Sequence, residues 1–345
     1  MYEDNIEELF PPEKYLVSPF NSTEAFVDRH YFLTDNQQEI KAKILRFVDN
    51  MDGGGFYAVY GEPGTGKTLL MYDIARTLME KGKKVIIGHA GSLNPGHFSL
   101  KNQGWDIRAT KDMIDITFES NQFDHTLRDL ADVYFIDEAQ RCYNLKQIAE
   151  EIAKQGKKCV ISLDPKQVMR DEECDFGNDS YVTTLVRANC DKLTANIRTN
   201  RQVYEFTKAL FSSHKTVNND CSKSVEITYC QTQTQVRIIQ EVLKKKGYVI
   251  PMFTPRGRGR EEYQDWFSLI GNSAHAVIGQ EFNKVAALIS PNMHYNSKGE
   301  LVSGKPYYYN EEKMLYQILT RARNKIHLII FNNTVVLERC LSLIN

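Results

Sequence analysis

The sequence predicts an α/β fold made of two domains, each with a parallel central sheet. Three observations lead to this prediction: short runs of apolar residues, helix-like segments between them, and a repeat of this alternation along the chain. Unbroken apolar runs are typical of parallel strands that are buried on both faces, and their alternation with helices is typical of doubly wound sheets. A chain of 345 residues accommodates two domains of ordinary size.

Apolar runs and helical periodicity define the elements expected in the first domain. The expected strands are residues 56–60, 84–87, 133–136 and 159–163. The expected helices are residues 36–50, 69–81 and 145–155. Thr34 and Gln37 form a capping-box pattern at the start of the first of these helices.

The second half repeats the alternation. Its expected helices are residues 201–212, 233–246 and 311–323, and its expected strands are residues 248–252, 285–289 and 325–331. Residues 1–30 lack a clear period and are expected to form an N-terminal arm. We therefore expect a first domain over residues 31–198 and a second over residues 199–345.

Composition limits the class of protein. Hydrophobic residues make up 42% of the chain and charged residues 25%, as in globular proteins. No stretch has the roughly 20 apolar residues that a membrane span needs, and the acidic start does not resemble a secretory signal. Seven scattered cysteines without a Cys-x-x-Cys pair argue against a disulfide framework or a zinc site, and for the cytoplasm. The net charge of −1 neither supports nor excludes binding to nucleic acid.

A glycine-rich motif directly follows the first expected strand and opens a helix. Residues 61–68 read G-E-P-G-T-G-K-T, which fits the phosphate-binding P-loop pattern. Glycines let backbone N–H groups face a phosphate, and the N-terminus of the helix adds a positive dipole end. We expect this loop to bind ATP and Mg²⁺ through Gly61, Gly64, Thr65, Gly66, Lys67 and Thr68. Lys67 would reach the β- and γ-phosphates, and the Thr68 hydroxyl would be a ligand of Mg²⁺.

Two carboxylates end the third expected strand. Asp137 and Glu138 follow the apolar run 133–136 directly. A carboxylate in the first position suits a magnesium ligand, and one in the second suits a general base that activates water. We therefore assign Asp137 to the metal and Glu138 to catalysis.

The segment D-E-A-Q at residues 137–140, downstream of a P-loop, resembles superfamily 1 helicases, and more narrowly the Schlafen-type (group 3) helicase-like ATPases. The resemblance implies two tandem RecA-like P-loop domains. It extends to residues 33–37, which resemble a Q motif and imply that Gln37 reads adenine. Residues 161–167 resemble motif III, whose Gln167 would sense the γ-phosphate, and residues 193–199 resemble motif IV, placing Arg198 at the phosphates.

Two more segments near the C-terminus follow the order of this family. Residues 275–282 are similar to motif V, which implies that Glu281 contacts the ribose. Residues 315–323 resemble motif VI, where Arg321 would be the arginine finger. The chain departs from the family at Ile278, where Gln is usual, and it has little room for the large insertions of many superfamily 1 motors.

Three regions are candidates for contact with nucleic acid. The first is the loop after the second strand, with His89, Ser92, Asn94 and His97. The second is the alternating run of Arg256, Arg258 and Arg260, whose alternative interpretation is a solvated loop. The third is the Tyr307–Tyr309 run, which could instead be a half-buried edge. Aromatic faces and cations in such loops are typical of single-strand binding.

Three functions remain open at this stage. The chain is expected to be an ATPase that translocates on, or remodels, single-stranded DNA or RNA. The alternative is an ATP-driven switch that works with a protein partner, such as a nuclease or defence subunit. A small-molecule kinase also uses a P-loop, but it would not need Arg321 or the second set of motifs. No membrane partner is expected.

Overall fold

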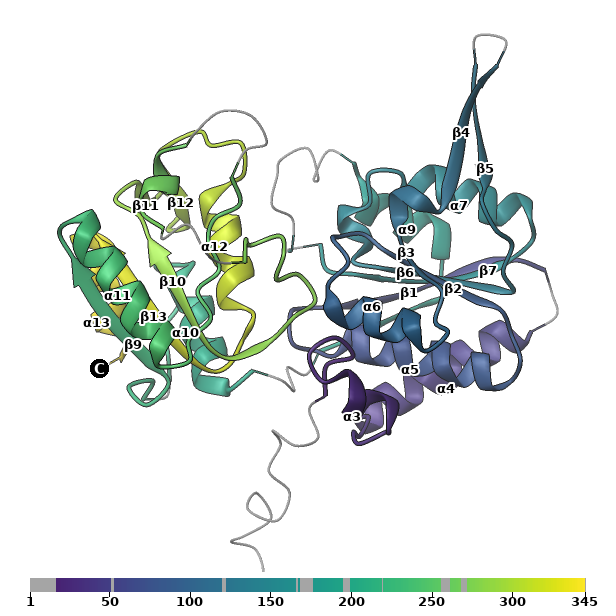
Figure 1. Cartoon of the computed structure of the whole chain (residues 1–345), viewed down its shortest axis with the longest axis horizontal. Helices are drawn as coiled ribbons and strands as arrows, with labels where there is room; N and C mark the ends of the chain where they lie inside the picture. Colours follow the sequence, from purple (N-terminus) through teal and green to yellow (C-terminus); the bar gives the residue numbers. More distant parts are fainter. Residues whose placement is uncertain are drawn as a thin grey trace, which may run out of the picture. The chain divides into compact units, whose positions relative to one another are not determined.

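The computed structural model describes residues 17–50, 53–119, 122–165, 167, 176–194, 199–218, 220–255, 261–267 and 272–344. The described chain divides into two compact units, one within residues 17–194 and the other within residues 199–344 (Figure 1). In the described residues, no helix is long and apolar enough to cross a membrane.

The first unit is built on a six-stranded sheet in which all neighbouring strands are parallel. Its strand order is β3-β2-β6-β7-β1-β8. The strands are β1 (Gly55–Gly61), β2 (Val85–His89), β3 (Ile107–Ala109), β6 (Val133–Asp137), β7 (Lys158–Leu163) and β8 (Cys190–Leu193). Strand β7 therefore lies between the strand that leads into the P-loop and the strand that ends in Asp137.

Helices cover both faces of this sheet (Figure 1). One face carries α3 (Thr23–Val27), α4 (Asp35–Asp49), α5 (Lys67–Glu80) and α6 (Pro95–Asn102). The other carries α7 (Leu145–Lys154) and α9 (Asn178–Val186). Successive residues of β1 alternate between the two cores: Tyr57 and Val59 belong to one, and Phe56 and Ala58 to the other. This alternation explains why the strand reads as an unbroken apolar run.

Residues 17–30 lie in the first unit, although the sequence analysis groups them with an N-terminal arm. Phe20 and Phe26 are buried in the core beside α5. The Arg76 guanidinium of α5 donates a hydrogen bond to the Phe26 carbonyl at 2.6 Å and lies 4.0 Å from the centre of its ring. This segment therefore packs against the helix that the P-loop opens.

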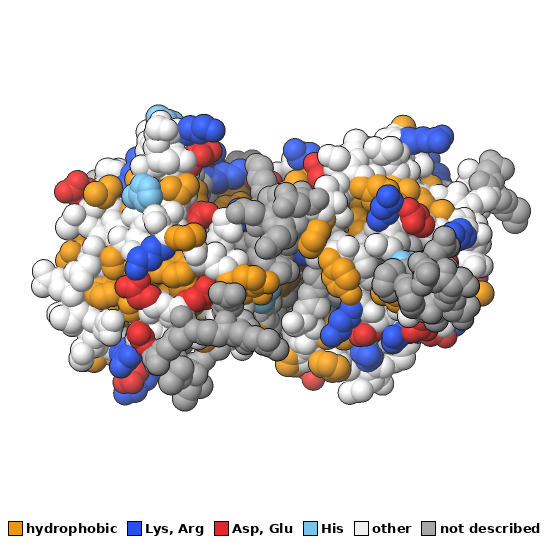
Figure 2. All heavy atoms as spheres, turned by 90° about the horizontal axis from the view of Figure 1, so that it is seen from above, with side chains coloured by type: hydrophobic (Ala, Val, Ile, Leu, Met, Phe, Trp, Pro, Cys, Tyr) orange, Lys and Arg blue, Asp and Glu red, His pale blue; other side chains and the backbone are white. Residues whose placement is uncertain are grey.

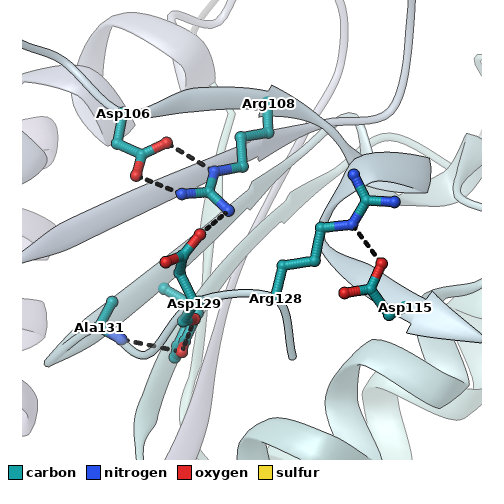
Figure 3. Close-up of polar contacts among 7 residues, drawn as sticks. Asp106, Arg108, Asp115, Arg128, Asp129 and Ala131 are labelled. Carbon is teal, nitrogen blue, oxygen red and sulfur yellow. Dashed lines mark hydrogen bonds and ion pairs between the residues drawn. The ribbon is translucent and has the colours of Figure 1, made fainter. Parts of the chain in front are cut away.

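A β-hairpin extends away from the sheet of the first unit, and the sequence analysis missed it (Figure 1). It consists of β4 (Ile114–Glu119) and β5 (Gln122–Leu127), which pair antiparallel, and it follows the short helix η1 (Thr110–Asp112). Ion pairs hold its base, as Figure 3 shows. Arg108 bonds Asp106 and Asp129, and Arg128 bonds Asp115.

The second unit has a smaller sheet of three parallel strands in the order β10-β13-β9. Its strands are β9 (Val225–Cys230), β10 (Phe282–Ile289) and β13 (Ala322–Phe331), with a separate hairpin of β11 (Met293–Tyr295) and β12 (Leu301–Ser303). Its helices are α10 (Arg201–Leu210), α11 (Gln233–Lys245), α12 (Glu311–Leu319) and α13 (Thr334–Ile344), with a short helix η3 (Glu262–Asp265). Each long helix contributes to one core, for example through Phe206, Val236, Leu315 and Val336.

The predicted fold class is confirmed: both units are α/β with parallel central sheets. In the second unit β9, β11, β12 and α13 were not predicted, and two predicted elements differ from the structure. The expected helix 311–323 ends at Leu319, and β13 already begins at Ala322. The expected strand 248–252 forms only isolated bridges, at Val249 and Met252. Pro251 explains this, because it has no N–H group to donate to a sheet.

Candidate functional site

The P-loop of the first unit has the backbone shape that its glycines predict. Gly64 and Gly66 have φ angles of 76° and 84°, in the left-handed region that glycine adopts without strain. Gly61 is required for a different reason, since a Cβ atom there would lie 2.5 Å from Thr65 Oγ1. Gly66 is the N-cap of α5, so the loop ends where the dipole of that helix favours an anion.

Lys67 and Gln37 are bonded to this loop. The Lys67 ammonium donates to the carbonyls of Gly61 at 2.6 Å and Glu62 at 3.1 Å. Gln37 is buried, and its amide nitrogen donates to the Thr65 carbonyl at 3.2 Å while its amide oxygen accepts from the Thr34 backbone N–H at 3.0 Å. Gln37 therefore ties the start of α4 to the P-loop in this structure, and the predicted capping box is present.

Asp137 lies at the centre of a buried polar cluster at the ends of β6 and β7 and the start of α5. Its carboxylate accepts from the Thr68 hydroxyl at 3.2 Å and from the Ser162 hydroxyl, and His89 Nδ1 lies 3.7 Å from Oδ2. Burial raises the pKa of Asp137, but His89, the Ser162 hydroxyl and the Lys67 ammonium outweigh burial and lower it below the ordinary value. A charged carboxylate beside a hydroxyl and a P-loop fits a hydrated Mg²⁺ ion.

Glu138 has an unusual backbone and a fixed side chain. Its φ of 59° places a non-glycine residue in the left-handed region, at the N-cap of the short helix η2 (Ala139–Arg141). Such a conformation costs on the order of 1–3 kcal/mol and persists only where its surroundings impose it. The Gln140 amide donates to the Glu138 carboxylate at 2.7 Å and accepts from the Asp164 backbone N–H at 3.0 Å.

Gln140 and Ser162 are parts of this cluster to which the sequence analysis gave no role. Gln140 was visible only as the last letter of D-E-A-Q, and Ser162 interrupts an apolar strand. A lone polar residue inside a buried strand was the available signal, because buried polar groups need partners. Gln167, five residues after Ser162, is also buried. Its backbone N–H donates to the Asp164 carbonyl at 3.0 Å.

A pocket of about 520 Å³ opens beside this cluster, at the ends of β2 and β3. Two aromatic side chains in its lining are exposed, Phe98 by 52% and Tyr143 by 59%. Lys111 and Arg141 bring positive charge to it. The sequence analysis missed these residues, because their shared position depends on four separate segments of the chain. The full lining is His89, Ala90, Gly91, Ser92, Leu93, Phe98, Ala109, Thr110, Lys111, Asp112, Arg141 and Tyr143.

Only Ser92 of the four residues proposed for the loop after β2 is exposed to this pocket. Asn94 and His97 instead cap α6: Asn94 Oδ1 accepts from the His97 N–H at 3.2 Å, and His97 Nδ1 accepts from the Asn94 N–H at 3.1 Å. His89 and His97 are both 0% exposed. Direct contact of these histidines with nucleic acid is therefore wrong for this structure. Burial lowers the pKa of His97 to about 2, so its ring is neutral.

In the second unit, Arg321 lies between α12 and β13, and Glu281 directly precedes β10. Arg321 is only 6% exposed, and its Nε atom has no hydrogen-bond partner among the described residues. Its backbone carbonyl accepts from the Phe282 N–H at 2.8 Å, which joins motif VI to motif V. The Glu281 carboxylate accepts two hydrogen bonds from Arg323, at 3.0 and 3.1 Å. Ile278 is buried, with 2% exposure.

Some predicted residues lie outside the described part of the chain. These are Arg198 and the arginine run at 256, 258 and 260. Of the tyrosine run, Tyr307 packs edge-on against Tyr263 and Tyr309 lies 4.5 Å from His275 between ring centres. Tyr308 is exposed by 42%. The run thus combines packed rings with one exposed ring.

Comparisons with solved structures find chains with the same kind of fold at low sequence identity. The Pif1 helicase from Candida albicans is 13% identical, with a TM-score of 0.47, and the match covers 88% of this chain and 96% of that one. The arterivirus helicase, nonstructural protein 10 in complex with DNA, is 10% identical with a TM-score of 0.39, covering 86% of this chain and 63% of that one. DnaA from Aquifex aeolicus is 14% identical with a TM-score of 0.30, covering 58% and 56%.

Comparison with curated proteins finds no match. A family model does match: residues 55–247 fit the model described as Schlafen group 3, DNA/RNA helicase domain. The match begins at β1, includes the P-loop, the D-E-A-Q segment and motif IV, and spans more than half of the chain. The chain therefore belongs to the Schlafen group 3 DNA/RNA helicase domain family.

Proposed function

We propose that this protein is a nucleic-acid-dependent ATPase that moves along, or remodels, single-stranded DNA or RNA. One observation supports this most: the Thr68–Asp137–Ser162 cluster and the Gln140-bound Glu138 lie at the start of the P-loop helix. The helicase-type P-loop ATPase fold of the family agrees with it.

In this proposal, the residues of the first unit each act on ATP hydrolysis. The P-loop N–H groups and Lys67 hold the β- and γ-phosphates. Thr68 and Asp137 would hold Mg²⁺, which when bound neutralises charge that develops on the phosphates. Glu138 takes a proton from water while the water oxygen attacks the γ-phosphorus and the bond to the bridging oxygen of ADP breaks. Gln140 holds the Glu138 carboxylate in place for that step.

The second unit would complete the reaction when ATP binds between the two units. Arg321 would place its guanidinium on the γ-phosphate as an arginine finger, joined by Arg198. Its Nε atom lacks a partner among the described residues, which fits a guanidinium that gains one from a phosphate. Glu281 would contact the ribose, for which its ion pair with Arg323 must loosen. Gln37 would contact the adenine, and Gln167 would contact the γ-phosphate.

The pocket beside the cluster would receive the nucleic acid. Exposed aromatic rings such as Phe98 and Tyr143 stack on bases regardless of sequence, and cations such as Lys111 and Arg141 attract phosphates. Figure 2 shows Lys and Arg side chains interspersed with Asp and Glu on the face that it draws. We infer that nucleic acid binds through local contacts of this kind. We also propose that the protein acts in the cytoplasm and has no membrane partner.

The test is steady-state ATP hydrolysis, without nucleic acid and with single-stranded DNA, single-stranded RNA or duplex DNA, at low salt. Stimulation of ATP hydrolysis by one of these nucleic acids supports the proposal and identifies the nucleic acid on which the protein acts. Lys67→Ala should weaken ATP binding, whereas Glu138→Gln should bind ATP and stop turnover. Near-wild-type hydrolysis in both variants would overturn the assignment of the site.

A switch that senses nucleic acid or a protein partner without unwinding is the second candidate. The buried Ile278 supports it, because the usual Gln of motif V is replaced by an apolar residue that packs inside the second unit. Such a protein partner could be a nuclease or a defence subunit. Equal hydrolysis with all four additions, together with a failure to separate a duplex, would favour this candidate.

A further inference from the structure

His89 is buried between the pocket and the Asp137 carboxylate, both within the first unit. It is the last residue of β2, belongs to the lining of the pocket, and is 0% exposed. Its position in the sheet is directly opposite Asp137, the last residue of β6. Because successive side chains of a strand point to opposite faces, these paired residues project to the same side of the sheet.

The backbone around His89 is fixed to β6, but its ring has no hydrogen bond. The Ala90 N–H donates to the Asp137 carbonyl at 3.0 Å. The His89 Nδ1 atom lies 3.7 Å from Asp137 Oδ2, just beyond hydrogen-bond distance. Neither ring nitrogen has a hydrogen-bond partner among the described residues. Leaving a buried polar group without a partner is unfavourable, so a small shift that forms a hydrogen bond is favourable.

Aromatic rings pack closely around His89. The His97 ring lies 4.6 Å from the His89 ring, and Phe20 stacks on His97 at 3.9 Å between ring centres. A Cβ atom on Gly96 would lie 2.3 Å from the Phe20 carbonyl oxygen, so this packing is close. Asp137 Oδ2, 3.7 Å from Nδ1, is the carboxylate oxygen beside the packed ring.

The segment after His89 forms one side of the pocket. Residues 90–93 line it together with Phe98 and Tyr143. Whatever binds there contacts the chain directly C-terminal to His89. A change of less than about 1 Å in this segment suffices to bring Nδ1 to the ordinary hydrogen-bond distance from Oδ2.

We propose that His89 is a positioning residue that couples nucleic acid in the pocket to the metal-binding carboxylate. A strand in the pocket closes the gap between His89 Nδ1 and Asp137 Oδ2, and the resulting hydrogen bond fixes the carboxylate for Mg²⁺. Hydrogen bonds of this kind to metal ligands typically change metal affinity or activity by about 10- to 100-fold. The inference rests on the proposed function and adds the residue through which the strand acts on the ATPase.

The experiment is a Mg²⁺ titration of ATP hydrolysis, with and without an oligo(dT) or oligo(U) strand. In the wild type, the strand should lower the Mg²⁺ concentration for half-maximal hydrolysis. The strand-induced decrease in this Mg²⁺ concentration should be about 10-fold smaller in His89→Leu and in His89→Gln. The Gln amide takes the place of Nε2, not of the Nδ1 atom that faces Asp137. His89→Asn places an amide nitrogen near Nδ1 and should restore most of the decrease.

Two further measurements separate the outcomes. Strand binding, followed by fluorescence anisotropy, should persist in the His89 variants, whereas Phe98→Ala should lose strand binding and the Mg²⁺ shift together. A full Mg²⁺ shift in His89→Gln, or none in His89→Asn while it binds the strand, overturns the role of His89 alone. If the wild type hydrolyses ATP equally with and without either strand, the proposed function fails, and the coupling fails with it.

Discussion

The two units each bury a carboxylate, and the pKa values of these two carboxylates are shifted in opposite directions. Asp137 in the first unit is 1% exposed, and Glu311 at the start of α12 in the second is 0% exposed. The pKa of Asp137 lies below its ordinary value, whereas burial raises the pKa of Glu311 to about 7. Equal burial therefore does not decide the charge of a carboxylate.

The neighbours explain the difference. Asp137 accepts hydrogen bonds from Thr68 and Ser162, with the Lys67 ammonium close by. Glu311 accepts from the Ser303 hydroxyl at 2.8 Å, but its Oε1 atom has no hydrogen-bond partner among the described residues. Burial is the main cause of its raised pKa, and Glu312 and Glu262 raise it further, although the Ser290 and Ser303 hydroxyls lower it. Hydroxyl donors thus act on both carboxylates, and the difference lies in His89 and the Lys67 ammonium, which lower the pKa of Asp137.

The surroundings of Asp137 suit a carboxylate that binds a cation, whereas those of Glu311 suit a carboxylate with a structural role. The groups around Asp137 lower its pKa and favour the charged carboxylate, which is what the proposed Mg²⁺ site would require. Glu311 is the first residue of α12, the helix that precedes Arg321. The following predictions test whether the two carboxylates differ in this way.

The largest effect is expected for Asp137→Asn. The amide keeps a hydrogen-bond acceptor for Ser162 but removes the charge that holds Mg²⁺, so kcat should fall on the order of 100- to 1,000-fold. Steady-state ATP hydrolysis measures it. Glu311→Gln is the matched control, since it neutralises a buried carboxylate outside the P-loop site, and it should retain near-wild-type turnover. Comparable losses in both variants would contradict the distinction.

The next effect concerns stability and pH at Glu311. A carboxyl whose pKa is raised from 4.5 to about 7 on folding binds its proton more tightly in the folded state. The free energy of unfolding should therefore fall as pH rises from about 4.5 to 7, by up to about 3 kcal/mol. Glu311→Gln should remove this dependence and be the more stable protein at pH 8. Urea denaturation across this pH range measures it, with the exposed Glu338→Gln as a control that should follow the wild type.

A smaller effect is expected at His327 in the sheet of the second unit. Its ring bonds Thr228 at 2.8 Å and Glu226 at 3.0 Å. Thr228→Val leaves a buried ring nitrogen without its partner and should lower the free energy of unfolding by about 1–2 kcal/mol. Burial lowers the pKa of His327 despite Glu226, so the unfolded chain binds the proton more readily and the wild type should lose stability as pH falls below about 6.5. Thermal denaturation at neutral and mildly acidic pH measures both, and no loss of stability on acidification would contradict the second.

The smallest effect is expected at the base of the β4–β5 hairpin. The Arg128–Asp115 pair is 2.7 Å long, but its side chains are 45% and 52% exposed. Arg128→Ala should lower the free energy of unfolding by less than about 1 kcal/mol, and added salt should erase the difference. Arg108→Ala should have the larger effect of the two, because Arg108 bonds both oxygens of Asp106 and also Asp129. The reverse order in urea denaturation would contradict this.

Local sequence determined the elements around the P-loop. Strand β1, the glycines and helix α5 follow from an apolar run, a turn that requires positive φ, and helical periodicity, all within 26 consecutive residues, Gly55–Glu80. The same local signals predicted β6 with its terminal Asp137 and Glu138. The family resemblance and the α/β fold class, which the comparisons and the structure confirm, rest on these segments.

Tertiary structure alone decided which distant residues meet at the site. Ser162 and His89 join Asp137 only because β2, β6 and β7 are neighbours in the sheet, and strand order is not written in any one segment. The pocket combines Phe98 of α6, Lys111 of η1 and Tyr143 from separate segments for the same reason. The opposite pKa shifts of Asp137 and Glu311 likewise depend on neighbours that only the folded chain supplies, because a pKa responds to the donors and charges in space around a group.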